Sequence, residues 1–319
     1  MNVLIIGDRL FSIDLAWGFE MLSHHAKAVF PKTVQELDAY LDEAPDLLIT
    51  VGSPIYYATE VLERLRQRPV PSTKYAHWDT DGITWAELEM NMIQKLQPDF
   101  VFTVCPEMLS LLKDKGIPSD LMHYAYSPIS HHSGPIADSA GQIAFMGNGY
   151  STVIAKYPHH YRRRSLDTLF KPLLDGGYRI DFYGDRDHRL VLKSLYNFDL
   201  PNDWYHGQLP YEDTWRIYNS CTINLVTQNN EHSLTKRTFE VLGSGGFALS
   251  YENAAIKEMF VTGRDLVVSS SPKQTLELVA YYLKHPDARK TIRNNALLSI
   301  QNHTYHKRAE YIVSRLGLN

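Results

Sequence analysis

The sequence is poor in cysteine and has no spacing typical of a metal site. Only Cys105 and Cys221 are present among 319 residues, and each lies within an apolar run. Isolated thiols of this kind are usually buried and unpaired, so the sequence predicts no disulfide framework and favours a reducing compartment. No CxxC pair or histidine-rich cluster indicates a bound metal or a metal cofactor. We therefore expect a cytoplasmic protein without a structural metal.

Long hydrophobic runs and a strong charge are also missing. No apolar stretch approaches the roughly 20 residues that span a bilayer, and the apolar residues that follow Asn2 are typical of a first strand rather than a signal peptide. The formal net charge is −4, which provides no overall field for attracting nucleic acid. These absences predict a soluble protein without nucleic-acid or membrane partners, and they leave its oligomeric state open.

The composition is that of a globular protein, and the length favours two domains of roughly 100–200 residues each. Short apolar β-branched runs alternate with segments of helical spacing, which indicates parallel sheets covered by helices. The fold class that we expect is α/β, with two Rossmann-like doubly wound domains facing across a cleft. The domains predicted are residues 1–135, residues 136–300, and a C-terminal helix in 301–319 that packs back toward the first domain. A loop at 127–139, rich in Ser, His, Pro and Gly, is the expected linker.

The expected strands are short and lie at regular intervals along both domains. They cover residues 3–6, 26–30, 46–51, 74–78, 100–104, 123–126, 143–147, 178–183, 204–206, 223–226, 247–250 and 266–268. The expected helices are longer and lie between or after these strands. They cover residues 34–41, 58–68, 85–96, 106–115, 161–174, 188–195, 211–219, 236–242, 254–260, 273–284, 286–300 and 306–316.

The segment 233–246 carries the clearest chemistry, because a polar loop runs into a short helix. Ser233 or Thr235 is placed to cap a helix whose free N–H groups and positive dipole end favour a phosphate. Lys236 and Arg237 stand in the first turn, where cations are disfavoured unless an anion is bound. Glu240 follows three residues after Arg237, so its carboxylate could accept ribose hydroxyls while Arg237 holds a diphosphate. The alternative is a surface Arg–Glu pair worth about 0.2–0.5 kcal/mol.

Further candidates for the same site follow other predicted strands of the second domain. Gly147 and Asn148 form a turn where backbone amides could approach a phosphate or a sugar. Gly184, His206 and Gly207 end later strands and could contact a nucleotide base. Plain turns explain each of these sequences equally well. The basic run at 161–164 is interpreted as a solvated helix face.

The first domain lacks the GxGxxG fingerprint after its first strand, which argues against a dinucleotide oxidoreductase. Asp79 and Asp81 follow a predicted strand, and one of them, with Asp79 as our choice, could be the general base for an acceptor hydroxyl in an inverting enzyme. A turn formed by the two aspartates is the alternative.

Four segments in the second half resemble the spore-maturation CgeB-like branch of group 1 glycosyltransferases. They are residues 236–249, 256–260, 281–289 and 303–308, with a looser likeness at 75–79 and 99–103. The resemblance covers about 147–308 and implies a GT-B enzyme of spore or cell-surface glycosylation, with the nucleotide sugar in the C-terminal domain, the acceptor in the N-terminal one and no metal or other cofactor. It matches Glu240 to the second glutamate of the Glu-x7-Glu motif, which lies on the ribose.

The first glutamate of that motif is replaced by His232, so the resemblance leaves a retaining or an inverting reaction open. We expect a metal-independent sugar transfer from a nucleoside-diphosphate sugar to an acceptor hydroxyl. A nucleotide-sugar epimerase and a non-catalytic nucleotide-sugar-binding protein are the alternatives. The sequence identifies neither the base and sugar of the donor nor the acceptor.

Overall fold

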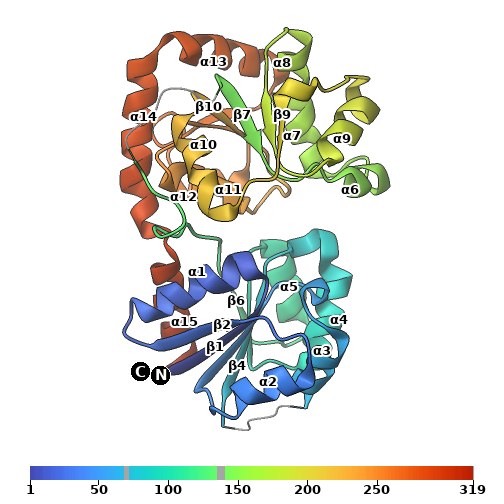
Figure 1. The fold of residues 1–319 in the computed structure, drawn as a ribbon, viewed down its shortest axis with the longest axis vertical. Helices are drawn as coiled ribbons and strands as arrows, with labels where there is room; N and C mark the ends of the chain where they lie inside the picture. Colours follow the sequence, from blue (N-terminus) through green and yellow to red (C-terminus); the bar gives the residue numbers. More distant parts are fainter. Residues whose placement is uncertain (68–71, 135–140, 319) are drawn as a thin grey trace. The chain divides into compact units, whose positions relative to one another are not determined.

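The chain folds into two compact α/β units in a computed structural model that describes residues 1–67, 72–134 and 141–318. The N-terminal unit combines Met1–Tyr124 with the returning segment Thr304–Asn319, and the C-terminal unit is Ala125–His303. Each unit contains one six-stranded sheet in which all neighbouring strands are parallel, with helices covering its faces (Figure 1). The α/β fold class expected from the sequence is confirmed.

The N-terminal unit has the strand order β2-β1-β3-β4-β5-β6. Its strands are β1 (Asn2–Gly7), β2 (His25–Val29), β3 (Leu47–Val51), β4 (Lys74–Asp79), β5 (Phe100–Thr103) and β6 (Ser119–Leu121). Its helices are α1 (Arg9–Glu20), α2 (Val34–Leu41), η1 (Pro54–Tyr56), α3 (Thr59–Arg66), η2 (Gly82–Trp85), α4 (Ala86–Leu96), α5 (Pro106–Asp114) and α15 (Tyr305–Leu316).

The C-terminal unit has the strand order β12-β11-β10-β7-β8-β9. Its strands are β7 (Ile143–Met146), β8 (Asp181–Tyr183), β9 (Tyr205–Gly207), β10 (Ile223–Val226), β11 (Ala248–Tyr251) and β12 (Val267–Ser269). Its helices are α6 (Ser151–Lys156), α7 (Tyr161–Leu169), α8 (Lys171–Asp175), α9 (Asp187–Tyr196), η3 (Asn202–Trp204), η4 (Tyr211–Asp213), α10 (Thr214–Ser220), α11 (Lys236–Gly243), α12 (Ala254–Met259), α13 (Pro272–Lys284), α14 (Pro286–Ser299) and η5 (Ile300–Asn302).

Several expected elements are corrected by the structure. No strand forms at 123–126, because the carbonyls of His123 and Tyr124 accept hydrogen bonds from Arg308 on α15, each at 2.8 Å, instead of joining the sheet. The edge strand is β6, four residues earlier in the chain. The expected helix 161–174 is divided into α7 and α8, with Phe170 ending one and Pro172 in the first turn of the other. Helices α1 and α6 were not predicted.

The boundaries of the units also differ from the predicted domain limits. The chain passes from one unit to the other at Tyr124–Ala125 and returns at His303–Thr304. The predicted limit at 135/136 lies in the segment 135–140, and the predicted end of the helix 58–68 lies in 68–71, both outside the described residues. The returning helix α15 packs against α1, so the last segment of the chain belongs to the first unit (Figure 1).

Each sheet has one point where the strand order reverses, and ligands of doubly wound sheets bind at the carboxyl ends of the strands at such points. In the N-terminal unit this switch point lies between β1 and β3, and in the C-terminal unit it lies between β7 and β10. The strands around both points are buried apolar segments with polar residues at their carboxyl ends. These two edges are therefore where functional side chains are expected.

The contact of α1 with α15 leads to the first prediction. A Cβ added at Gly18 would lie 2.6 Å from the carbonyl carbon of Tyr305, which is backbone and cannot rotate away. In a helix without such a neighbour, replacing Gly by Ala would stabilise the folded state by about 0.5–1 kcal/mol. Gly18→Ala should instead lose about 1–3 kcal/mol by overpacking, measured as faster hydrogen exchange in α15 and a lower unfolding midpoint. Asn91→Ala, on the exposed face of α4, is the control and should not lower the midpoint. A gain in Gly18→Ala would contradict the packing of α15.

Candidate functional site

The switch point of the C-terminal sheet is lined by Arg237 and the glycine that ends β7. Gly147 has φ +152°, and a Cβ at this position would lie 2.6–2.8 Å from the guanidinium atoms of Arg237. The guanidinium carbon also lies 5.6 Å from the centroid of the Phe145 ring. Glycine is thus required at position 147 for two reasons: its positive φ is unfavourable for other residues, and Arg237 fills the space that a side chain would need. The predicted neighbours Gly147 and Arg237 are brought together in the structure.

A second arginine, Arg162 on α7, lies beside the first and is only 1% exposed. One of its terminal nitrogens donates to Asn229 Oδ1 at 2.8 Å, and the other donates to the carbonyl of Asn148. Its guanidinium carbon is 4.4 Å from the ring centroid of Tyr150. It is also 5.8 Å from that of Phe145, so both arginines flank the same phenylalanine.

The two guanidinium groups place two positive charges close together, one of them fully buried and the other partly buried. Burial lowers the pKa of Arg162 to about 10, and the charge of Arg237 acts in the same direction, although Tyr150 and Asp185 oppose it. The Nε atoms of both arginines are buried and have no hydrogen-bond partner among the described residues. Buried cations are usually paired, and unpaired donors are costly. The arrangement can hold an anion, and arginine forks match phosphate oxygens.

Arg162 was missed by sequence reasoning, which placed it on a solvated face. The signal was its spacing: Ser165, Leu166 and Leu169 follow it by three, four and seven residues and are all buried. Arg162 therefore stands on the buried stripe of α7, while Arg163 faces outward and pairs with Asp167 one turn along the helix.

Glu240 lies at the centre of a hydrogen-bond network. Its two carboxylate oxygens accept from Tyr211 at 3.1 Å and from Tyr218 at 3.2 Å. Its ion partner is Lys236, at 3.5 Å, whereas Arg237 turns toward Gly147. Tyr218 also shares a hydrogen bond with Arg237. The surface Arg–Glu pair considered from the sequence is thereby replaced by a buried network that links Glu240 to the arginine site.

The charge of Glu240 is stabilised despite its burial. Burial alone would raise the pKa of Glu240, but Lys236, His131, Arg237 and the Tyr211 hydrogen bond hold it below its usual value. An ionised carboxylate has about four lone-pair sites. The oxygens of Glu240 therefore retain capacity for ligand hydroxyls, and its role on a ribose stays a prediction.

The loop before α11 is fixed by contacts within the unit. Thr235 is the N-cap residue, but its hydroxyl donates to the carbonyl of Thr227 at 3.1 Å and does not cap the helix. The carbonyl of Ser233 accepts from Asn253 at 3.0 Å. His232 is exposed, and its backbone N–H donates to Asn230. No side chain therefore caps the first N–H groups of α11 in the described structure, which leaves them open to an anion.

The other predicted residues lie along β7, β8 and β9. The Gly147 N–H donates to the Tyr183 carbonyl at 2.9 Å, and the Gly184 N–H donates to the Gly207 carbonyl at 2.8 Å, so the three glycines line one edge. His206 is turned away from this edge, because its Nε2 lies 2.8 Å from the carboxylate of Asp181 at the amino end of β8. The structure groups the glycines with the arginines but does not place the imidazole of His206 there.

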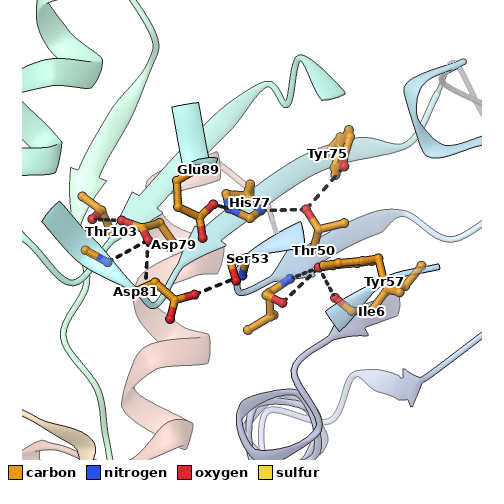
Figure 2. Close-up of polar contacts among 12 residues, drawn as sticks. Ile6, Thr50, Ser53, Tyr57, Tyr75, His77, Asp79, Asp81, Glu89 and Thr103 are labelled. Carbon is orange, nitrogen blue, oxygen red and sulfur yellow. Dashed lines mark hydrogen bonds and ion pairs between the residues drawn. The ribbon is translucent and has the colours of Figure 1, made fainter. Parts of the chain in front are cut away.

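In the N-terminal unit, Asp79 is used as a structural anchor. One of its oxygens accepts from the N–H groups of Asp81 and Gly82, at 3.0 and 3.1 Å, and the other accepts from Thr103 at 2.6 Å (Figure 2). The side chain is fully buried. These contacts match the turn that was the alternative to catalysis, because one oxygen of Asp79 holds the chain after β4 and the other binds Thr103 at the end of β5.

Asp81 is the more accessible carboxylate at this edge. Its side chain is partly exposed and accepts from the Ser53 N–H at 3.2 Å. Burial, together with the carboxylates of Asp79 and Asp8, raises the pKa of Asp81 to about 6, while Ser53 opposes the shift. A carboxylate with a pKa near the working pH suits proton transfer.

A buried polar chain lies behind these aspartates (Figure 2). Tyr75, His77 and Asp79 share one face of β4 because strand side chains alternate. His77 Nδ1 is 2.9 Å from the Thr50 hydroxyl, and its Nε2 is 3.5 Å from Glu89. Burial lowers the pKa of His77 to about 4, although Asp79 and Asp81 act in the opposite direction. Burial, together with the same aspartates, raises the pKa of Glu89 well above its usual value.

The shift at Asp81 predicts a pH-dependent stability. A carboxyl group whose pKa rises from 3.8 in the unfolded chain to about 6 costs no stability below pH 3.8 and costs most above pH 6. Asp81→Asn should therefore be more stable than the parent protein at pH 8, by about 1–3 kcal/mol, and equally stable at pH 4. Thermal unfolding at the two pH values tests this. Asp114→Asn, an exposed change in the same unit, should show no such pH dependence. A stability difference between Asp81→Asn and the parent protein that is the same at both pH values would contradict the pKa shift.

Among the described residues, no helix is long and apolar enough to cross a membrane, and no group of three or more His, Cys, Asp or Glu side chains is arranged to hold a metal ion.

Comparison with known proteins gives one family match, in the C-terminal half of the chain. Residues 162–314 match the profile of a family described as "Glycosyl transferase-like". The C-terminal unit carries a glycosyltransferase-like region. This region contains Arg162, Arg237 and Glu240 and includes most of α15. No curated protein sequence matches the chain.

Solved structures show the fold of the whole chain. Sucrose-phosphate synthase from Thermosynechococcus elongatus is similar with a TM-score of 0.67 at 12% identity, over 99% of this chain and 98% of that one. Anabaena HepE in complex with UDP has a TM-score of 0.62 at 11% identity, over 99% and 100%. A putative UDP-N-acetylglucosamine 2-epimerase from Listeria monocytogenes has a TM-score of 0.55 at 11% identity, over 99% and 95%. The glycosyltransferase-like region is therefore part of a GT-B fold, in which more than one kind of chemistry occurs.

Proposed function

We propose that the protein transfers a sugar from a nucleoside-diphosphate sugar to an acceptor hydroxyl. The observation that carries this proposal is the pair of neighbouring arginines at the switch point of the glycosyltransferase-like unit, of which Arg162 is fully buried and Arg237 partly buried. Arg162 and Arg237 have unpaired donors next to the open N-terminus of α11, and a diphosphate offers the charge and the oxygen acceptors that these groups lack. Glu240 is linked to Arg237 through two hydrogen bonds of Tyr218, at a place suited to a ribose.

In the proposed reaction these groups stabilise the departing diphosphate. Negative charge grows on the leaving phosphate as the bond to the anomeric carbon breaks. Preorganised cations and N–H donors in a dry site lower the energy of that state. Lys236 contributes a further charge from its partly buried position beside Glu240. We propose that this set replaces a metal ion in the reaction.

Substitutions of neighbouring arginines test the site. Arg237→Ala should abolish donor turnover, and Arg162→Lys should lower it about 10²–10³-fold, because a lysine cannot supply the planar fork. Turnover is measured as nucleoside diphosphate released, and binding of UDP, GDP and TDP by calorimetry. Arg163→Ala is the matched control from the same helix, since Arg163 only pairs with Asp167 at the surface. Normal turnover in Arg237→Ala, with the fold intact by circular dichroism, would refute the assignment.

Metal independence is tested separately. Turnover should be unchanged in excess chelator and should not rise by more than about twofold on adding Mg²⁺ or Mn²⁺, because the cations of the protein already balance the diphosphate. Loss of turnover in chelator that returns with one of these metals would contradict this part of the proposal.

Deprotonation of the acceptor is assigned to Asp81 rather than to Asp79 if the reaction inverts. Asp79 is fully buried with its oxygens occupied, whereas Asp81 is partly exposed. The replacement of the first motif glutamate by His232 leaves the stereochemistry open. Membership of the CgeB-like branch, hexosyl transfer and a cytoplasmic role in spore or cell-surface glycosylation remain predictions from the sequence resemblance.

A nucleotide-sugar epimerase is the second candidate, favoured by the likeness of the fold to the putative Listeria epimerase. An epimerase needs no acceptor. Incubation with UDP-N-acetylglucosamine alone, analysed by NMR for an inverted sugar centre, distinguishes the two. A protein that binds the nucleotide sugar but neither isomerises nor transfers it would be a non-catalytic binding protein.

A further inference from the structure

The carboxyl edge of the N-terminal sheet differs in charge from the edge that carries the arginines. Asp8 follows β1, Asp79 ends β4, and Asp81 follows within two residues. Asp8 and Asp79 both act on Asp81 as like charges and raise its pKa. Three carboxylates therefore meet at the switch point of this sheet, and the charges that act most strongly on Asp81 are negative.

A fourth carboxyl group, that of Glu89, lies near Asp79 and Asp81 and has no hydrogen-bond partner among the described residues, although His77 Nε2 is 3.5 Å away. Glu89 on α4 is 0% exposed, and neither of its carboxylate oxygens has a partner among the described residues. Its end lies between His77 and Asp79 (Figure 2). A buried carboxyl group without a hydrogen-bond partner is costly, and Glu89 adds a further carboxyl group close to Asp79 and Asp81.

Exposed apolar and aromatic side chains stand on the two segments that follow β3 and β4. Ile55 is 74% exposed and Tyr56 40% exposed on η1, and Trp85 is 38% exposed on η2. Such side chains beside a few convergent polar groups are typical of sites for small organic ligands. A sugar ring has this combination, with hydroxyl donors at its rim and C–H groups on its faces.

We propose that this edge binds the acceptor as an uncharged saccharide, through hydrogen bonds from its hydroxyls to Asp81 and its neighbours, and that it rejects phosphorylated sugars. The inference deepens the proposed function and rests on it. Carboxylates only accept hydrogen bonds, so they fit hydroxyl donors. A phosphate at the same place would meet the like charges of Asp81, Asp79 and Asp8, which costs binding energy and provides selectivity.

The selectivity is measured with matched acceptors. Methyl glucoside, methyl galactoside and methyl mannoside are each compared with the 6-phosphate of the same sugar. The donors are UDP-glucose, UDP-galactose and GDP-mannose, and products are read by mass spectrometry. At least one neutral sugar should be glycosylated, with kcat/KM at least about tenfold above that of its phosphate, which corresponds to about 1.4 kcal/mol.

Charge-removing variants show whether the carboxylates cause the selectivity. Asp81→Asn and Asp8→Asn should each lower the ratio of neutral to phosphorylated acceptor by about threefold or more, even where the overall rate falls. Asparagine is also a good N-cap, so Asp8→Asn keeps the start of α1 and serves if Asp81→Asn is inactive. Asp114→Asn, at the far end of α5, is the matched control and should leave the ratio unchanged.

The outcomes separate this inference from the proposed function. Equal use of a phosphorylated sugar, or a ratio unchanged in both variants, overturns the neutral-acceptor inference while the donor assignment stands. Donor hydrolysis without transfer to any neutral sugar overturns it as well. Failure to bind any of UDP, GDP and TDP, measured by calorimetry without an acceptor, refutes the donor site itself.

Discussion

The interaction on which the C-terminal unit depends is the placement of two guanidinium groups against one phenylalanine ring. Arg162 and Arg237 reach Phe145 from different helices, and the charge of Arg237 helps to lower the pKa of Arg162. Gly147 lacks the side chain that would exclude Arg237. Like charges held close together are typical of sites where a ligand of opposite charge compensates them, which is why the proposed function places an anionic diphosphate here.

Hydrogen bonds and an ion pair in that unit link Arg237 to the other residues of the site. Tyr218 shares hydrogen bonds with Arg237 and Glu240, and Glu240 holds Lys236. The helix α11 therefore presents its cations, its carboxylate and its free N–H groups as one rigid set. Because these contacts are buried, loss of one member should disturb the others, and effects of paired substitutions here should not be additive.

The two switch points of the chain have opposite electrostatic character. The C-terminal one gathers Arg162, Arg237 and Lys236, whereas the N-terminal one gathers aspartates around Asp81. Both use the same sheet architecture, so the difference comes only from the residues that follow the strands. This division is consistent with the transfer proposed above, in which an anionic donor binds in one unit and a hydroxyl-bearing acceptor in the other. The net charge of −4 gives no sign of this difference between the two units.

Local sequence determined most of the elements and some of the site. The alternation of apolar runs and helical spacing located β10, α2 and α11 to within a residue, and the polar loop before α11 identified Arg237 and Glu240. Tertiary structure alone decided what these residues contact: it buried Arg162, turned His206 toward Asp181, and tied up Asp79 in a turn. The reason is physical. Periodicity reports which face of an element is buried, whereas the partners of a polar side chain depend on residues distant in the chain that only the packed fold brings together.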